Sequence, residues 1–275
     1  MIIRTRGCRR FGEKGVPRKS LPGGLSMRIL ISPAKKMRTD PDTLPWETMP
    51  AFLHEAETLW RCMQAMEDQA LQALWRCSDA IAAQNTKRLR TLNLRRRLTP
   101  AILAYDGIQY RYMAPGVFDS GQYAYAREHL RILSGLYGLL RPFDGVVPYR
   151  LEMQAKLHAE GCRDLYAYWG DKPARALAAE TGCILNLASQ EYSRAVERHL
   201  PAGMRMITCI FGQRIGGKIV EKGTLCKMAR GEMVRFLAER DGGPETAQAF
   251  SGLGYRYAPL ESTPERYVFL QEEVR

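Results

Sequence analysis

Two glycines and two arginines in one central stretch are the residues best suited to meet a phosphate. Gly135 and Gly138 lie three residues apart, between Arg131 and Arg141, in the segment Leu130–Pro142. Glycines at a turn permit positive φ and remove side chains, so backbone N–H groups can reach an anion. A helix N-terminus after the turn would favour the same anion. The alternative is a tight connection between two helices, with glycine at the C′ position.

The loop that follows presents two arginines on a stiff backbone. Pro142 and Pro148 restrict the chain between Arg141 and Arg150. A guanidinium held by a rigid loop loses little entropy on binding, and its planar fork matches two phosphate oxygens. The sequence therefore predicts that Arg141 and Arg150 bind phosphate.

Carboxylates near these arginines leave two alternatives open. Asp144 and Glu152 could pair with Arg141 and Arg150 within the protein. They could also, with Asp106, hold a divalent metal in a nuclease or phosphate-transfer site.

Lysines occur at two further places with a possible ligand role. Lys35 ends a small-residue turn after an expected strand at 28–32, where a cation would lie over the carboxyl end of a sheet. The turn lacks the glycines of a P-loop, which excludes nucleotide binding in that mode. Lys227 and Arg230 share one face of a helix expected at 224–239, with Thr224 as its cap, although the face could simply be solvated. The six basic residues at 87–97 could likewise bind a ligand or form an ordinary solvated face.

The cysteines and histidines do not suggest a metal centre or a catalytic set. Seven cysteines are scattered without a Cys-x-x-Cys pair, and the four histidines share no ligand spacing. No nucleophile–base motif is present. We therefore expect no cofactor, no catalytic residues, and binding in preference to catalysis.

The net charge of +12 divides into two equal parts. Residues 1–26 hold seven bases and one acid, which is half of the total. This leader lacks the apolar core of a signal peptide, and no apolar run approaches the ~20 residues of a membrane helix. We expect a soluble cytoplasmic protein with no membrane partner, in which 1–26 is a flexible basic leader or a misassigned start; a DNA-binding arm is the alternative.

Helical and strand patterns interleave from residue 27 onwards. This order predicts one α/β (mixed α+β) domain over 27–275, with a mixed sheet and surrounding helices. Helices are expected at 51–77 (one long or two short), 79–94, 123–133, 164–180, 191–200 and 224–239. Strands are expected at 28–32, 101–105, 183–187, 204–213, 217–221, 255–257 and 267–270.

Six ordered segments resemble the YaaA peroxide-stress family. They are Ile31–Lys35, Ala101–Gly107, Leu133–Pro142, Pro148–Met153, Asn186–Tyr192 and Ala229–Met233. The resemblance spans Met27 to about Leu270.

The resemblance implies a basic cleft, a helix-hairpin-helix-like element, which we map to 123–140, and binding to duplex, branched or bubble-containing DNA. It also implies a link to DNA protection and repair and to lowered free intracellular iron. The predicted DNA contacts are Lys35, Arg131, Gly135, Gly138, Arg141, Arg150, Lys227 and Arg230. No small-molecule substrate is indicated. A metal-dependent nuclease and an iron-handling protein are the competing functions.

Overall fold

A sheet of eight strands forms the centre of the computed structural model, which describes residues 27–40 and 42–271. Five strands are parallel, and the chain is a mixed α/β single domain, as predicted. The sheet order is β4-β3-β1-β6-β7-β10-β9, with β8 paired to β7. The parallel strands are β1 (Arg28–Ile31), β3 (Leu130–Ser134), β6 (Cys183–Leu187), β7 (Arg205–Ile215) and β10 (Arg266–Gln271). The antiparallel strands are β4 (Gly138–Leu140), β8 (Lys218–Val220) and β9 (Tyr255–Tyr257).

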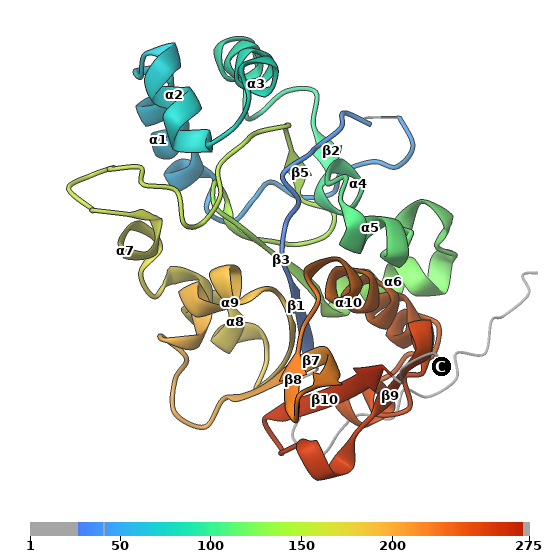
Figure 1. Ribbon diagram of the computed structural model, residues 1–275. Coiled ribbons are helices and arrows are strands. Elements are labelled where there is room, and N and C mark those ends of the chain that lie inside the picture. The colour runs from blue at the N-terminus through green and yellow to red at the C-terminus, as the bar shows by residue number, and fades with distance from the viewer. Residues whose placement is uncertain (1–26, 41, 272–275) are drawn as a thin grey trace, which may run out of the picture.

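Helices cover both faces of the sheet (Figure 1). On one face, α6 packs on β1 and β3, and α10 packs on β7 and α5. On the other face, α8 packs on β4 and α9 on β3, while α1–α3 form a separate group at one end. The longer helices are α1 (Leu53–Gln64), α2 (Asp68–Trp75), α3 (Asp79–Thr91), α6 (Ser120–His129), α8 (Lys172–Glu180), α9 (Gln190–Glu197) and α10 (Gly223–Ala238). The shorter ones are α4 (Ala101–Ala104), α5 (Ile108–Met113), α7 (Leu165–Trp169), α11 (Pro244–Ala247) and the 3-10 turns η1 (Pro115–Val117), η2 (Gly252–Gly254) and η3 (Pro259–Glu261). A two-residue ladder joins β2 (Thr99–Pro100) to β5 (Gly145–Val146).

Most expected elements are confirmed. The first strand, the 183–187 strand and the hairpin turning at Gly216-Gly217 occur as predicted, and 51–77 forms two helices. No helix in the described residues is long and apolar enough to cross a bilayer. The leader at 1–26 lies outside the described residues.

Three helix or strand predictions are wrong in part. Residues 101–104 form a helical turn, and the segment 164–180 breaks into α7 and α8 at Gly170, whose φ is +50°. Pro173 then occupies the first turn of α8, where its missing N–H is harmless. Thr224 does not cap α10, which begins one residue earlier without a side-chain cap.

The most consequential correction concerns the segment 123–140, which is not a pair of helices. Helix α6 ends at His129, and Leu130–Ser134 is a central strand whose five residues are all buried. The apolar residues Leu130, Ile132 and Leu133 fit a short buried strand as well as they fit the last turn of a helix. The turn at Leu136-Tyr137 then joins β3 to the antiparallel β4. The predicted helix-hairpin-helix-like element is therefore a helix followed by a β-hairpin.

The close contact between Gly135 and Leu151 gives a test of this packing. A Cβ at Gly135 would lie 2.3 Å from the carbonyl oxygen of Leu151, so Gly135→Ala must displace backbone. We expect the free energy of unfolding to fall by about 2–4 kcal/mol in urea titrations. Gly116→Ala is the matched control, because a Cβ there meets nothing within 4 Å. Equal stability of the two variants would contradict the packing described here.

Candidate functional site

The carboxyl ends of three neighbouring strands define the surface where the family segments meet. Because β1, β3 and β6 are parallel, the residues that follow them lie at one edge of the sheet. There the Ser189 N–H donates to Ser32 Oγ at 2.8 Å, joining the end of β6 to the end of β1. We call this surface the carboxyl edge.

Close backbone contacts bring the other family segments to the same edge. A Cβ at Gly107 would lie 2.7 Å from the Ala34 side chain, and Gly135 contacts the backbone of Leu151. A Cβ at Gly231 would lie 2.0 Å from the carbonyl oxygen of Gln109, which ties α10 to α5. Five of the six segments that carry the resemblance are thus linked to one another by contacts at this edge, and the sixth, Ala229–Met233, packs on α5. The segment 133–142 leaves the edge along β4.

Buried tyrosine hydroxyl groups connect the segments at the carboxyl edge by hydrogen bonds. Tyr149 Oη lies 2.9 Å from Tyr105 Oη and 2.7 Å from Ser134 Oγ, and the Tyr110 hydroxyl donates to the Ser32 carbonyl at 3.0 Å. Burial raises the pKa of Tyr149 to about 12, so the phenol keeps its proton at neutral pH. This chain of hydroxyls is structural.

Exposed bases cover recessed acids at the carboxyl edge. Lys35 Nζ lies 2.8 Å from Glu152, and its side chain is 65% exposed against 18% for the acid. Lys36 and Arg111 bind Asp106 at 2.8 and 3.2 Å, with side chains 71% and 65% exposed against 22% for Asp106. An approaching macromolecule therefore meets positive charge first.

Arg150 lies behind this layer and is mostly buried. It donates to the carbonyl of Trp75 at 3.3 Å and lies 3.5 Å from Glu152. The structure thus favours the alternative in which Arg150 and Glu152 are internal partners. Burial and the nearby Glu152 carboxylate raise the pKa of Glu191, whose carboxylate accepts the Gln154 N–H.

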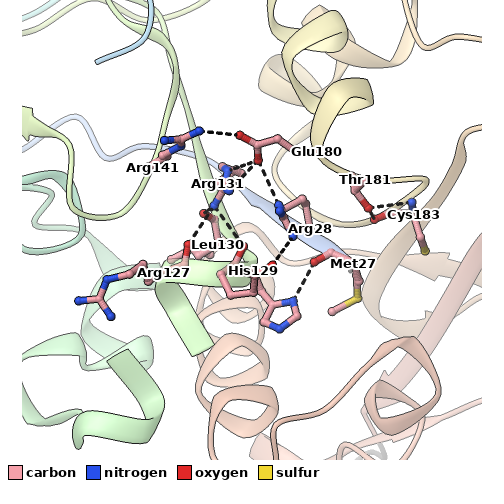
Figure 2. Close-up of polar contacts among 11 residues, drawn as sticks. Met27, Arg28, Arg127, His129, Leu130, Arg131, Arg141, Glu180, Thr181 and Cys183 are labelled. Carbon is pink, nitrogen blue, oxygen red and sulfur yellow. Dashed lines mark hydrogen bonds and ion pairs between the residues drawn. The ribbon is translucent and has the colours of Figure 1, made fainter. Parts of the chain in front are cut away.

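Arg131 and Arg141 lie at the opposite, amino edge of the sheet, around Glu180 (Figure 2). Glu180 accepts from Arg131 at 2.6 Å, from Arg28 at 3.1 Å and from Arg141 at 3.2 Å. Burial raises the pKa of Glu180, but the guanidiniums lower it by more, so the net shift is downward. Arg131 is buried, whereas Arg141 is exposed at this edge, which is opposite the edge that holds Lys35.

The two α10 bases have different environments. Arg230 is buried and pairs with Glu221 at 3.2 Å. Lys227 is exposed and has no ion pair with any described residue. Only Lys227 of the two is accessible to a ligand.

The predicted glycines do not present N–H groups to solvent. Gly135 and Gly138 are both buried. Gly138 has a φ of +69° and packs against Trp169, whose ring would be 2.8 Å from an added Cβ. Their role in the structure is close packing at the β3–β4 turn.

The three acids of the alternative metal site, Asp106, Asp144 and Glu152, do not form one group. Asp144 is buried at the amino edge, where it accepts from Thr48 Oγ1 at 2.6 Å and from the Arg141 N–H at 2.8 Å. Asp106 and Glu152 each pair with bases at the carboxyl edge. Over residues 27–40 and 42–271, no three His, Cys, Asp or Glu side chains are grouped to hold a metal ion.

Three bases at this surface were missed by the sequence reading. Lys36 follows Lys35 directly, and its place in the same turn was a usable signal. Arg38 and Arg111 join the edge only through the tertiary fold, because Arg38 binds the Leu103 carbonyl and Arg111 extends from α5. No local pattern indicated them.

The fold and this surface define an α/β protein with a basic layer over the carboxyl edge of its sheet. The chain belongs to the YaaA family, since the family model described as peroxide stress protein YaaA matches residues 27–261.

Its relatives are similar over nearly their whole length. A UPF0246 protein of Desulfitobacterium hafniense is 50% identical over 246 residues, which cover 89% of this chain and 98% of the relative. A UPF0246 protein of Lactiplantibacillus plantarum is 47% identical, with 90% and 100% covered, and one of Agathobacter rectalis is 46% identical, with 88% and 98% covered.

Glu180 gives a first prediction for this region. Glu180→Gln removes the carboxylate shared by Arg28, Arg131 and Arg141. We expect the free energy of unfolding to fall by about 2–4 kcal/mol, because buried Arg131 loses its counter-charge. Glu239→Gln is the matched control: Glu239 also contacts two arginines but is 39% exposed, so its loss should cost less than about 1 kcal/mol. Equal losses in urea titrations would show that burial does not set the strength of these pairs.

Asp144 gives a prediction on pH. Burial raises its pKa to about 6, against the hydrogen bonds from Thr48 and Arg141 that lower it. A raised folded pKa means that this group stabilises the fold most below pH ~4 and loses that contribution as pH rises through about 6. Asp144→Asn can keep both contacts, with its amide donating to Thr48 Oγ1. We expect wild type to lose about 2 kcal/mol relative to this variant between pH 4 and 7.5. A stability difference that stays constant over that range would show that Asp144 titrates normally.

Proposed function

We propose that this protein binds DNA without strong sequence preference as its part in the peroxide stress response, in the cytoplasm. The contact surface is the carboxyl edge, with Lys35, Lys36, Arg38 and Arg111 as phosphate contacts and Lys227 as a further one. The observation that carries the proposal is the layering of exposed bases over recessed acids.

This layering suits a polyanion better than it suits internal ion pairing. Exposed ion pairs contribute little to stability, so the lysines gain little from their acids alone. A lysine ammonium has three donors, and Glu152 or Asp106 leaves some of them free for phosphate oxygens. Lysine and arginine side chains of this kind contact the phosphate backbone of DNA and do not contact the edges of the nucleobases. We therefore expect DNA binding that tolerates changes of DNA sequence.

The proposal revises the contacts expected from the sequence. Arg131, Arg150 and Arg230 are largely buried, and Arg141 faces the opposite edge. We therefore retain Lys35 and Lys227 and replace the others by Lys36, Arg38 and Arg111. Protection of DNA would then come from coverage of its backbone. The implied link to lowered iron finds no ligand cluster among the described residues.

Salt-dependent DNA binding tests the proposal. If about five phosphates are engaged, log K should fall with log salt at a slope of roughly −4 to −5. The double change Lys35→Ala and Lys36→Ala should reduce the magnitude of the slope by about 2 and weaken binding roughly tenfold or more near physiological salt.

The control for this test removes the same charge at the other end of the sheet. Arg205 and Arg266 are exposed at the amino ends of β7 and β10. The Arg205→Ala and Arg266→Ala double variant should bind DNA almost as wild type does. Equal losses in both double variants would mean that net charge, and not the carboxyl edge, drives binding. Magnesium-dependent cutting of the probe would instead favour the nuclease alternative.

A further inference from the structure

A cavity of about 250 Å³ lies beside the exposed bases of the carboxyl edge. It is formed by the turn after β1, by α4, and by α5 with η1. Its lining residues include Arg38, Tyr105, Asp106, Tyr110, Arg111 and Pro115–Val117. The sequence reading assigned no small molecule to this part of the chain.

The walls of the cavity are mainly apolar and partly open. Val117 lines it and is 68% exposed, so an apolar side chain faces the opening of the cavity. Next to it, Gly116 leaves open space, since an added Cβ would meet nothing within 4 Å. The rings of Tyr105 and Tyr110 are tilted against each other at 5.3 Å and are fixed by buried hydrogen bonds. These two rings are held rigidly, so a flat ring can lie against this wall of the cavity without rearranging it.

The charges at the cavity are mostly positive. Arg38 and Arg111 line it, and Lys36 reaches the same mouth through Asp106. Asp106 also binds Arg111, and Asp40 lies 3.7 Å from Arg38, so these five groups carry a net charge of +1. The hydrogen bond from Lys36 lowers the pKa of Asp106, with Arg111 acting in the same direction against burial. Asp106 therefore stays ionised and can accept from N–H groups of a ligand.

We infer that this cavity binds one nucleoside monophosphate unit, with its base against Val117 and Pro115 and its phosphate on Arg38 and Arg111. The planar guanidinium groups can each bind two phosphate oxygens, and the apolar walls can pack against a nucleobase. The volume lies just below the about 300–1,000 Å³ of ordinary ligand pockets, which favours one base and not a dinucleotide.

A free mononucleotide and an unpaired nucleotide in a DNA strand share this chemistry. The second source rests on the proposed function, whereas the first does not. If the nucleotide belongs to a DNA strand, the basic side chains of Lys35 and Lys36 lie where the neighbouring phosphates of that strand would run.

Calorimetric titration of the full chain tests the inference. The probes are the four deoxynucleoside 5′-monophosphates, with inorganic phosphate as the reference ligand. We expect at least one mononucleotide to bind roughly tenfold or more tightly than phosphate, because the base adds buried apolar contact. Arg111→Ala should weaken that binding about tenfold through loss of a charge-assisted contact.

Val117→Asp places a negative charge at the mouth of the cavity without disturbing the core, since Val117 is largely exposed. We expect this variant to lose mononucleotide binding by about tenfold or more. Val220→Asp is the matched control, because Val220 is an exposed valine on β8 outside the cavity, and it should bind as wild type does. Thermal unfolding of both variants checks that they are folded.

Two DNA probes then distinguish the source of the nucleotide. A duplex with one unpaired nucleotide is compared with a fully paired duplex of equal length, in wild type and in Val117→Asp. Preference for the unpaired probe that disappears in Val117→Asp assigns the cavity to a strand-borne nucleotide, and tight mononucleotide binding without this preference assigns it to a free one.

The inference is overturned if no mononucleotide binds better than inorganic phosphate and the unpaired nucleotide gives no advantage. It is equally overturned if Val117→Asp and Val220→Asp behave alike with every probe. The fully paired duplex reports on the proposed function separately: if it binds while both nucleotide probes fail, the basic surface remains and only the cavity is misassigned.

Discussion

The organisation of this protein depends on close contacts at three glycines, where a side chain would hold the neighbouring segment away. Gly107 meets Ala34, Gly135 meets Leu151 and Gly231 meets the Gln109 carbonyl, each at a distance that excludes a Cβ. The first two contacts hold the segments 101–107 and 148–153 against the turns that follow β1 and β3, and the third ties α10 to α5. Only then do Lys36, Arg38 and Arg111 become neighbours. The surface proposed to bind DNA is thus a product of close packing and not of a local motif.

The two edges of the sheet use the same residue types in opposite ways. At the carboxyl edge the acids are recessed and the bases face solvent. At the amino edge Glu180 is the centre, and Arg28 and Arg131 are held inside by it. A buried guanidinium needs its partner for the fold to be stable, whereas an exposed one can exchange its partner for a ligand.

The sequence was sufficient for the fold class and for most elements, because periodicity marks buried strands and amphipathic helices directly. It misassigned Leu130–Ser134, since three apolar residues among five directly after a helix do not show where that helix ends. Leu136 and Tyr137, two residues between the glycines, were compatible with the β-turn that the structure has. The sequence could not show which basic residues are buried. Arg131, Arg230 and Lys35 are all charged residues in plausible binding segments, and only the fold shows which of them solvent can reach. The cavity beside Arg111 brings together residues 38, 102–103, 105–106, 110–111 and 114–117, which no spacing rule connects.

The Glu180 cluster has a consequence for how the protein responds to ionic strength. Dissolved ions screen charges that solvent surrounds, with a Debye length of about 8 Å at physiological strength, and screen enclosed charges far less. Concentrated salt would therefore compete for the outer lysines while the arginines around Glu180 keep their partner. Release from a polyanion and loss of the fold are then governed by separate sets of charges. If the protein binds DNA as proposed, salt should release it from the DNA while its fold stays intact.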